Sequence, residues 1–447
     1  MPTETLMMKD SGIDCIAEIP ENWEVKRLKF ILNNDFNNMR VGPFGTALTD
    51  SDFKESGYWV YNQRCVLDNN FDSNDVFINE QKYRELKSFK VFPNDILITT
   101  RGTIGKVAIV PENIYEGVLH PCLIRFVVNS DCINNDFIKY IFNDTNIAMQ
   151  QIMNKSNSTT IEVIYSYNLK DIYLVIPPIE EQQAIADFLD EKCEKIDKVI
   201  GEIEEQIQIL EDYKKSLITE TVTKGLDKNV PMKDSGIDWI GEIPKNWEIS
   251  RIKYDALFYN GDRSEEYPSG NDIVDEGIPF VNSENIHDTF LDLTSCKCIT
   301  DEKYKRLGGA KLKINDIIFC LRGSVGNCAI NKSINEGTVA SSLVAIRANN
   351  INPDFLNYYL NSDSTVFQTA LFQNGSCAAN LSAEKVSNYY ICIPTLKEQE
   401  QIADYLDKEC AKIDTTINDK KEQLETIKEY KKSLIYEYVT GKKRVAC

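Results

Sequence analysis

The sequence predicts an α+β protein, in which two mixed α/β domains are joined by two long antiparallel coiled-coil helices in a pseudo-two-fold internal repeat. Three observations predict this fold: a duplicated order of segments, two uninterrupted heptad patterns, and short β-branched runs between them. The 447 residues are 42% hydrophobic, so the chain can bury more than one core. A repeat close to half the chain length is too long for a solenoid unit and is typical of a duplicated domain-plus-helix module.

The duplication is direct and nearly collinear. The matching segments are 8–30 with 232–254, 94–109 with 315–330, and 171–223 with 388–440. In the first pair, MKDSGIDCIAEIPENWEVKRLKF and MKDSGIDWIGEIPKNWEISRIKY, 16 of 23 positions are identical. The blocks 36–80 and 260–301 between the matches show almost no resemblance. The scaffold is therefore duplicated, whereas the parts that it presents are not.

The repeat and its flanking prolines predict the domain boundaries. We expect an N-terminal segment (1–23), a first domain (24–178), a central helix (179–222), a connector repeating the N-terminal segment (223–247), a second domain (248–395), a C-terminal helix (396–440) and a tail (441–447). Within the domains, runs such as Ile96–Thr99 and Leu123–Val128 are rich in β-branched residues and predict strands.

The two long helices are expected to pair with each other. Their apolar residues recur at alternating steps of four and three, which is the spacing of a coiled-coil seam. In the central helix the only polar members of this seam are Gln182 and Lys214. The expected pairing residues are Leu189, Ile196, Ile203, Ile207, Leu210, Leu406, Ile413, Leu424, Ile427 and Leu434. A two-fold relation between the modules would make the helices antiparallel, and the alternative is that each helix packs only on its own domain.

Further apolar residues lie off this seam. They are Ile185, Phe188, Val199, Ile402 and Tyr405. They predict a second apolar stripe, which would be available to helices of a partner protein.

Charge and cysteine content limit the possible function. The net charge of −19 opposes nucleic-acid binding at first, because a basic chain is the usual expectation. However, residues 180–220 alone carry −8, whereas residues 24–179 carry −2 and residues 248–396 carry −5. Each domain would therefore need a local basic patch to bind DNA.

The cysteine content and the lack of membrane signals predict the compartment. The sequence has thirteen cysteines without a C-x-x-C pair, no apolar run close to the length of a membrane span, and no signal-peptide pattern. These features predict a cytoplasmic protein with reduced thiols and no membrane contact.

Glycine turns and basic residues are the candidate DNA contacts. The turns Arg101–Gly105 and Arg322–Gly326 share the pattern R-G-[TS]-[IV]-G, which either presents an arginine to DNA or simply supports a strand.

Basic residues around a tyrosine predict phosphate contacts, or else form a solvated charged face. These residues are Lys82, Arg84, Lys87 and Lys90 in the first copy, and Lys303, Lys305, Arg306 and Lys311 in the second. Base readout would come from the unlike blocks, with candidates Arg40, Gln63, Arg64, Arg263 and Asn282.

Motifs for chemistry are absent from the sequence. The adenine-methyltransferase tetrapeptide, the P-D…E-x-K nuclease arrangement, the Walker loop, the dinucleotide fingerprint and the nucleophile elbow do not occur. With only two histidines, neither histidine-based catalysis nor a structural zinc site is expected. The chain is therefore predicted to be non-catalytic.

The order of motifs resembles a known family. An I-P-x-N-W segment, a divergent block, N-D-I with R-G-[ST]-[IV]-G, and then [IV]-P-x-x-x-E-Q-x-x-I-A-x-[FY]-L-D with a long helix occur twice. This order resembles the specificity subunit of Type I restriction-modification systems over nearly the whole chain. One departure is N-D-I, where the family often has G-D-I.

The resemblance implies a DNA sequence-specificity subunit. Two target recognition domains on an antiparallel helical spacer would each read one half of an asymmetric bipartite site in double-stranded DNA. Two adenine methyltransferase subunits and two motor-nuclease restriction subunits are the implied partners, and S-adenosylmethionine, ATP and Mg²⁺ would be bound by them rather than by this chain. A coiled-coil scaffold without a DNA role and an enzyme with a degenerate active site remain the alternatives.

Overall fold

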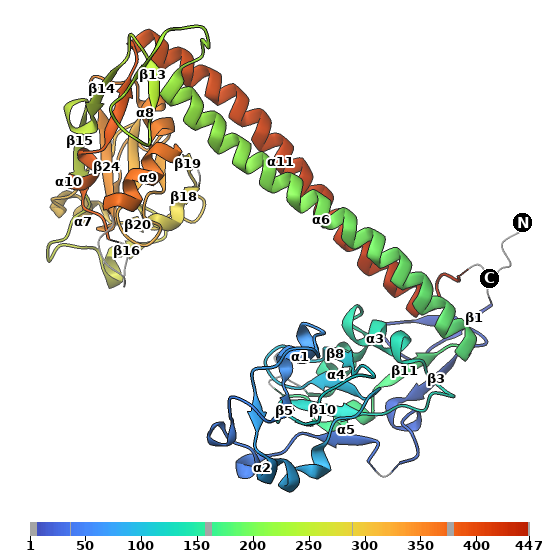
Figure 1. The fold of residues 1–447 in the computed structure, drawn as a ribbon. Helices are drawn as coiled ribbons and strands as arrows, with labels where there is room; N and C mark the ends of the chain where they lie inside the picture. The colour runs from blue at the N-terminus through green and yellow to red at the C-terminus, as the bar shows by residue number, and fades with distance from the viewer. Residues whose placement is uncertain (1–6, 36, 157–162, 288, 373–379, 446–447) are drawn as a thin grey trace, which may run out of the picture. The chain divides into compact units, whose positions relative to one another are not determined.

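The computed structural model describes residues 7–35, 37–156, 163–287, 289–372 and 380–445 (Figure 1). The chain forms two compact units, one comprising Met1–Glu202 and Gln423–Cys447, and the other Ile203–Glu422. The long helices α6 (Ile179–Lys224) and α11 (Leu396–Val439) each contribute to both units. No helix in the described ranges is long and apolar enough to cross a membrane.

The first unit is built on small, mainly antiparallel sheets. The pairs are β1 (Met8–Asp10) with β2 (Glu18–Pro20), and β3 (Glu24–Arg27) with β11 (Tyr173–Ile176). A four-stranded sheet has the order β4 (Met39–Val41), β10 (Leu123–Phe126), β7 (Ile96–Thr99), β8 (Val107–Ile109). A three-stranded sheet has the order β6 (Phe77–Ile78), β5 (Tyr58–Tyr61), β9 (Gly117–Leu119). The helices are α1 (Gln63–Leu67), α2 (Glu80–Glu85), α3 (Asn135–Asn143), α4 (Ile147–Ser156) and α5 (Ser166–Lys170).

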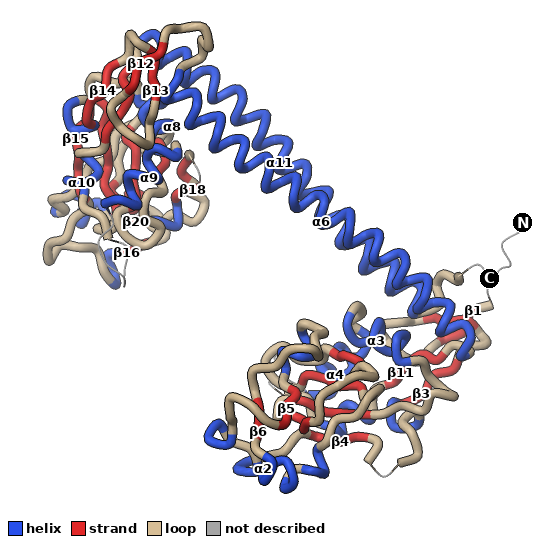
Figure 2. Tube along the Cα trace, viewed as in Figure 1, coloured by secondary structure: helices blue, strands red, loops and turns tan. Residues whose placement is uncertain are grey.

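The second unit repeats this plan with a larger sheet. The pairs are β12 (Met232–Asp234) with β13 (Glu242–Pro244), and β14 (Glu248–Arg251) with β25 (Tyr390–Ile393). A six-stranded sheet has the order β15 (Ala256–Asn260), β24 (Leu343–Ala348), β21 (Asp316–Cys320), β22 (Cys328–Ile330), β19 (Phe290–Leu291), β18 (Ile286–His287). A four-stranded sheet has the order β16 (Ile273–Val274), β20 (Cys298–Ile299), β17 (Ile278–Val281), β23 (Thr338–Val339). The helices are α7 (Asp301–Arg306), α8 (Pro353–Leu360), α9 (Asp363–Phe372) and α10 (Ala383–Ser387), and loops connect many of the short strands (Figure 2).

The expected strands form where the β-branched runs predicted them. β7 is Ile96–Thr99, and β10 begins at Leu123 but ends at Phe126, two residues before the expected limit. Every residue of β7 and of its counterpart β21 is buried, because a hydrophobic core packs on each face of the strand. In β7, Ile96 and Ile98 join one core and Leu97 another, and β21 alternates between two cores in the same way. These strands fix the positions of the loops that follow them.

The two long helices pair antiparallel in each unit, as the heptad pattern predicts. In the first unit Phe188 contacts Tyr438 and Asp197 pairs with Lys431, so the contacts on α11 move backwards as α6 advances. In the second unit Lys214 pairs with Asp414 in the same sense. The helices also pack on the domain cores, because Leu434 and Val439 join the first core and Ile218 and Val222 join the second. These residues lie near the end of each helix and on the core of the other domain, whereas Leu189 and Leu406, near the helix starts, join the core of their own domain. The alternative that each helix packs only on its own domain is therefore wrong.

Each long helix has a buried glutamine in its first turn, Gln182 in α6 and Gln399 in α11. The Gln182 side-chain amide donates to the Pro177 carbonyl over 2.8 Å, and its oxygen accepts from the Asn134 backbone N–H over 2.8 Å. Gln399 makes the matching bonds to Pro394 and Asn352 in the second unit. The glutamines therefore tie the helix start to the loop before α3 or α8, so the assignment of Gln182 to the helix-pairing seam was wrong.

Candidate nucleic-acid interface

Loops from several strands meet at one edge of the first unit. The Thr100 N–H and hydroxyl both donate to the Cys122 carbonyl, over 2.9 and 2.8 Å. Gln63, at the start of α1, donates from its side-chain amide to the Thr103 carbonyl over 3.2 Å. Gly42 lies so close to His120 that a Cβ at this glycine would be 2.2 Å from the His120 carbonyl oxygen. These contacts hold the loops after β4, β5, β7 and β9 together.

The second unit has a matching edge. The Leu321 N–H donates to the Ser342 carbonyl over 2.8 Å, and Arg263 donates from Nε to the Ser341 carbonyl over 3.3 Å. A Cβ at Gly261 would be 2.2 Å from the Ala340 carbonyl oxygen, as at Gly42 in the first unit. The scaffold of this edge is thus common to both units, although their side chains differ.

The R-G turns, residues 101–105 and 322–326, lie on these edges. Their four glycines have positive φ, of +66° and +80° in the first turn and +78° and +96° in the second, where a glycine avoids the Cβ strain of other residues. The Gly105 N–H donates to the Thr99 carbonyl over 2.8 Å, which closes the first turn onto β7. Arg101 and Arg322 are exposed, and no acidic side chain of the described ranges forms an ion pair with either.

The other predicted phosphate contacts are largely paired with acidic groups. Lys82 Nζ lies 3.2 Å from Asp52 and 3.4 Å from Glu85, and the hydrogen bond to Asp52 raises its pKa. Lys303 Nζ lies 3.1 Å from Glu266, and the hydrogen bond to this carboxylate raises its pKa in the same way. Only 19% of the Lys82 side chain and 12% of the Lys303 side chain are exposed, so both lysines stabilise loop packing.

Helical ion pairs account for a further group. Arg84 pairs with Glu80, Lys305 with Asp301, and Arg306 with Glu302, each four residues apart on the exposed faces of α2 and α7. Such exposed pairs contribute little to stability, but each of these cations already has a carboxylate partner. Lys90 pairs with Glu116 at 2.6 Å, and Lys311 lies on the Tyr304 ring, where burial lowers its pKa.

The remaining candidates divide between structural and exposed positions. Arg40 lies over the Phe89 ring at 4.8 Å, and Asn282 caps the turn at Ser283–Asn285 by accepting from the Glu284 N–H. Arg64 is exposed and lies 3.3 Å from Asp75, whereas Lys87 is exposed without an ion-pair partner in the described part of the chain. The structure brings Gln63 and Arg101 together on one edge and places Lys82 and Arg84 on α2.

His120 belongs to the first edge but was missed by the sequence analysis. Its Nδ1 lies 2.9 Å from the Cys122 Sγ, and its ring stacks with Phe53 at 6.3 Å. Burial lowers the pKa of His120, so the ring is held neutral. The sequence did contain a signal for His120, because it lies just before β10 at a position where the second copy of the repeat has Ala340 instead. Among the described residues, no group of histidines, cysteines and carboxylates could hold a metal ion.

The helix-pairing residues are mostly buried. Leu189, Ile203, Ile207, Leu406, Ile413, Leu424 and Leu434 are buried, and Ile196, Leu210 and Ile427 are half-buried. The polar seam member Lys214 lies 2.6 Å from Asp414, and the equivalent Lys431 lies 2.7 Å from Asp197. The repeat thus places one lysine–aspartate pair between the helices in each unit.

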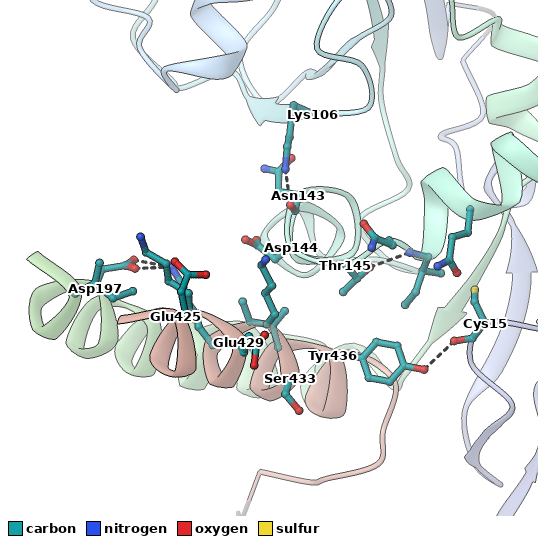
Figure 3. Close-up of a pocket in the computed structure, with 18 residues that line it drawn as sticks. Cys15, Lys106, Asn143, Asp144, Thr145, Asp197, Glu425, Glu429, Ser433 and Tyr436 are labelled. Atoms are coloured by element: carbon teal, nitrogen blue, oxygen red, sulfur yellow. Dashed lines mark hydrogen bonds and ion pairs between the residues drawn. The ribbon is translucent and has the colours of Figure 1, made fainter. Parts of the chain in front are cut away.

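The predicted second apolar stripe is wrong in part. Ile185 and Ile402 are 0% and 1% exposed, because they pack into the cores of their own units. Val199 and Tyr405 do remain exposed, at 42% and 37%. Beside the helices of the first unit lies a groove of about 910 Å³, lined by residues such as Lys106, Asn143, Asp197, Glu425 and Tyr436 (Figure 3).

Taken together, these units define a class of protein: a tandem-duplicated scaffold that presents unlike loop edges in its two copies. The family model described as Type I restriction modification DNA specificity domain matches residues 20–209 and 244–426. The chain therefore belongs to the family of Type I restriction-modification DNA specificity subunits, the non-catalytic DNA-recognition subunits of these systems.

Relatives carry the same family description, and solved structures share the fold. A putative type I restriction enzyme MjaX specificity subunit of Methanocaldococcus jannaschii is 28% identical, over 96% of each chain. The MjaVIII specificity subunit of the same organism is 24% identical, over 96% of this chain and 94% of its own. A solved chain from work on assembly and conformational transition of the type I R-M system has a TM-score of 0.71 at 15% identity, covering 95% of this chain and 99% of its own. The HsdS subunit of Thermoanaerobacter tengcongensis has a TM-score of 0.51 at 16% identity, covering 95% and 98%.

Proposed function

We propose that each unit reads one half of an asymmetric, bipartite site in double-stranded DNA. The observation that carries this proposal is the contrast between a common scaffold and unlike edges. Both units have the capped turn after β5 or β17, with Asn62 and Asn282 as the caps, but Gln63 in one unit corresponds to Ser283 in the other. Two edges with different side chains would recognise different base sequences.

The proposed partner subunits would carry out methylation and cleavage of the DNA. Two methyltransferase subunits would bind the helices, and two motor-nuclease subunits would join them in a restriction complex in the cytoplasm. S-adenosylmethionine, ATP and Mg²⁺ would be bound by those subunits. The support is the absence of catalytic motifs from the sequence, together with the exposed apolar side chains of Val199 and Tyr405 on the helices.

Domain exchange tests the assignment of one half-site to each unit. Residues 24–178 would be replaced by the matching block of a relative, and the methylated motif would be mapped across a genome in cells that contain the methyltransferase partner. We expect one half of the motif to change and the other half to persist. The reciprocal exchange of residues 248–395 is the matched control and should change the other half. Simultaneous change of both halves in either exchange would refute separate reading.

The isolated chain is predicted to be inactive. Because the sequence lacks the motifs for methyl transfer and DNA cleavage, the purified chain with S-adenosylmethionine should leave DNA unmethylated. Addition of the methyltransferase subunit should restore both specific binding and methylation. Methyl transfer by the chain alone, after removal of contaminating enzyme, would contradict the prediction.

A further inference from the structure

The two R-G turns place the same exposed guanidinium at the same point of both units. Arg101 follows β7 and Arg322 follows β21, and both backbones form a bridge to a distant residue, Val163 or Asn380. Resting on the proposed function, we propose that Arg101 and Arg322 are matched phosphate anchors, each binding the DNA backbone in one half-site. They hold the duplex in register on each edge but do not read its bases.

Without an acidic partner among the residues that the structure describes, these arginines are available for a phosphate. In the described ranges neither forms an ion pair, whereas Lys82, Arg84, Lys303 and Arg306 each have a carboxylate within 4 Å. A paired cation must give up its carboxylate before it binds DNA. An unpaired arginine can instead form two charge-assisted hydrogen bonds to a phosphate and release the counterions of the DNA directly.

The turns are also held rigidly. In the first unit Thr100, the residue before Arg101, makes two hydrogen bonds to the Cys122 carbonyl. A Cβ at Gly105 would lie 2.3 Å from the Met149 Sδ, so the turn is packed closely on α4. In the second unit the Gly326 N–H donates to the Cys320 carbonyl over 3.1 Å. A preorganised turn loses little conformational freedom when its arginine binds.

Identity of the two turns favours phosphate over base recognition. A side chain that is the same in two units reading different half-sites carries no sequence information, and phosphate contacts have this property. Beside the first turn, Gln63 donates from its side-chain amide to the Thr103 carbonyl, whereas its counterpart Ser283 carries a hydroxyl and no amide. The unlike side chains next to the anchors are therefore the ones suited to distinguish bases.

Binding measurements on the full chain with its methyltransferase subunit test the anchors. Arg101→Ala and Arg322→Ala should each weaken binding of a duplex carrying the methylated motif by about tenfold, which is roughly the value of one charge-assisted contact. Each should lower the slope of log affinity against log salt by about 0.9. The sequence of the methylated motif should stay unchanged. Arg101→Lys should keep most of the salt slope, and the charge-matched controls Arg84→Ala and Arg306→Ala should lose much less affinity.

Duplexes in which one phosphate at a time is replaced by an uncharged methylphosphonate identify the phosphate that each arginine contacts. Single methylphosphonates would be placed along each strand of the duplex. We expect one substitution in one half-site to weaken the wild-type complex but not the Arg101→Ala complex, and one in the other half-site to do the same for Arg322→Ala. Thermal unfolding of each variant with the same midpoint as wild type would show that the fold is intact.

The outcomes separate this proposal from the function on which it rests. If wild type with its partner binds DNA and both arginine variants keep full affinity and salt slope, the anchors are refuted while DNA reading stands. A changed motif in Arg101→Ala or Arg322→Ala would assign these side chains to base recognition and overturn the proposal. Equal losses in the Arg84 and Arg306 controls would show a general charge effect instead. Absence of specific binding by the wild-type complex would refute the proposed function.

Discussion

At the scale of single residues, the N-D-I motif has a physical reason in both units. Asn94 and Asn315 have φ values of 65° and 69°, in the left-handed region that glycine adopts without strain and asparagine tolerates. The aspartate that follows is buried and pairs with an arginine, Asp95 with Arg125 at 2.9 Å and Asp316 with Arg347 at 2.7 Å. The departure from G-D-I thus retains the turn, because asparagine is among the residues best able to replace glycine.

Substitution of Asn94 tests this account. Asn94→Ala should lower the free energy of unfolding by about 1 kcal/mol, because alanine is strained in the left-handed region. Asn94→Gly should be neutral or stabilising, and the midpoint of urea unfolding measures both. Because Asn94 also donates to Glu112, Glu112→Ala is the control for that hydrogen bond. If glycine destabilises as much as alanine, backbone strain is not the reason for asparagine here.

His120 gives the first unit a pH dependence. Burial lowers its pKa in the folded state, while the unfolded value is about 6.5. The folded state therefore binds the proton more weakly, so this contribution to stability is present above about pH 6.5 and is lost as pH falls through the folded pKa. Thermal unfolding between pH 7 and 5 should show a smaller decrease in His120→Gln than in wild type. Equal decreases in the two proteins would exclude His120 as the source.

At the scale of elements, the lysine–aspartate pairs fix the register of the two helices. Lys214 matches Lys431, and Asp414 matches Asp197, in the repeat, so the repeat makes the same pair once in each unit. A polar group in an otherwise apolar seam is a common device for specifying register in coiled coils. The pairs therefore favour this antiparallel alignment over one shifted by a heptad.

A double-mutant cycle measures the coupling energy between Lys214 and Asp414. Lys214→Ala and Asp414→Ala should show a coupling energy of about 0.5 to 1 kcal/mol, a modest value because Asp414 is 45% exposed. The exposed pair Lys195–Glu191 on α6 is the control and should couple by about 0.3 kcal/mol. Urea unfolding of the four proteins in each cycle gives these values. Coupling no larger than in the control would remove the argument for register.

The elements also show what sequence can and cannot predict. Helix pairing and the buried strands follow from local periodicity, so α6 and β7 were identified correctly. The carboxylate partners of Lys82 and Lys303, by contrast, come partly from distant loops, at Asp52 and Glu266. A one-dimensional pattern of basic residues does not contain these partners. For the same reason it could not separate Arg101, which has no ion pair within the described part of the chain, from the paired lysines.

At the scale of the whole molecule, the paired helices are the continuous elements shared by both units. Their seam residues are buried along both halves, including Leu189 and Leu434 in the first unit and Leu406 and Ile413 in the second. A continuous packed seam resists bending more than a flexible linker does. We therefore expect the number of heptads to set the gap between the half-sites that the units read.

Insertion of one heptad into both helices tests whether the helix length sets the gap between the half-sites. Because the helices are antiparallel, seven residues are added after Ile203 and after Lys420, which keeps the seam in register. The insertion lengthens the pair by about 10 Å, or about three base pairs at roughly 3.4 Å per pair. Three pairs also turn the duplex by about 100°, so activity should fall sharply on the original site, and any methylated motif that remains should have a longer gap. A single insertion after Ile203 is the control and should destabilise the helix pair. Efficient methylation of the original motif by the doubly extended chain would show that the partner subunits, not the helices, set the spacing.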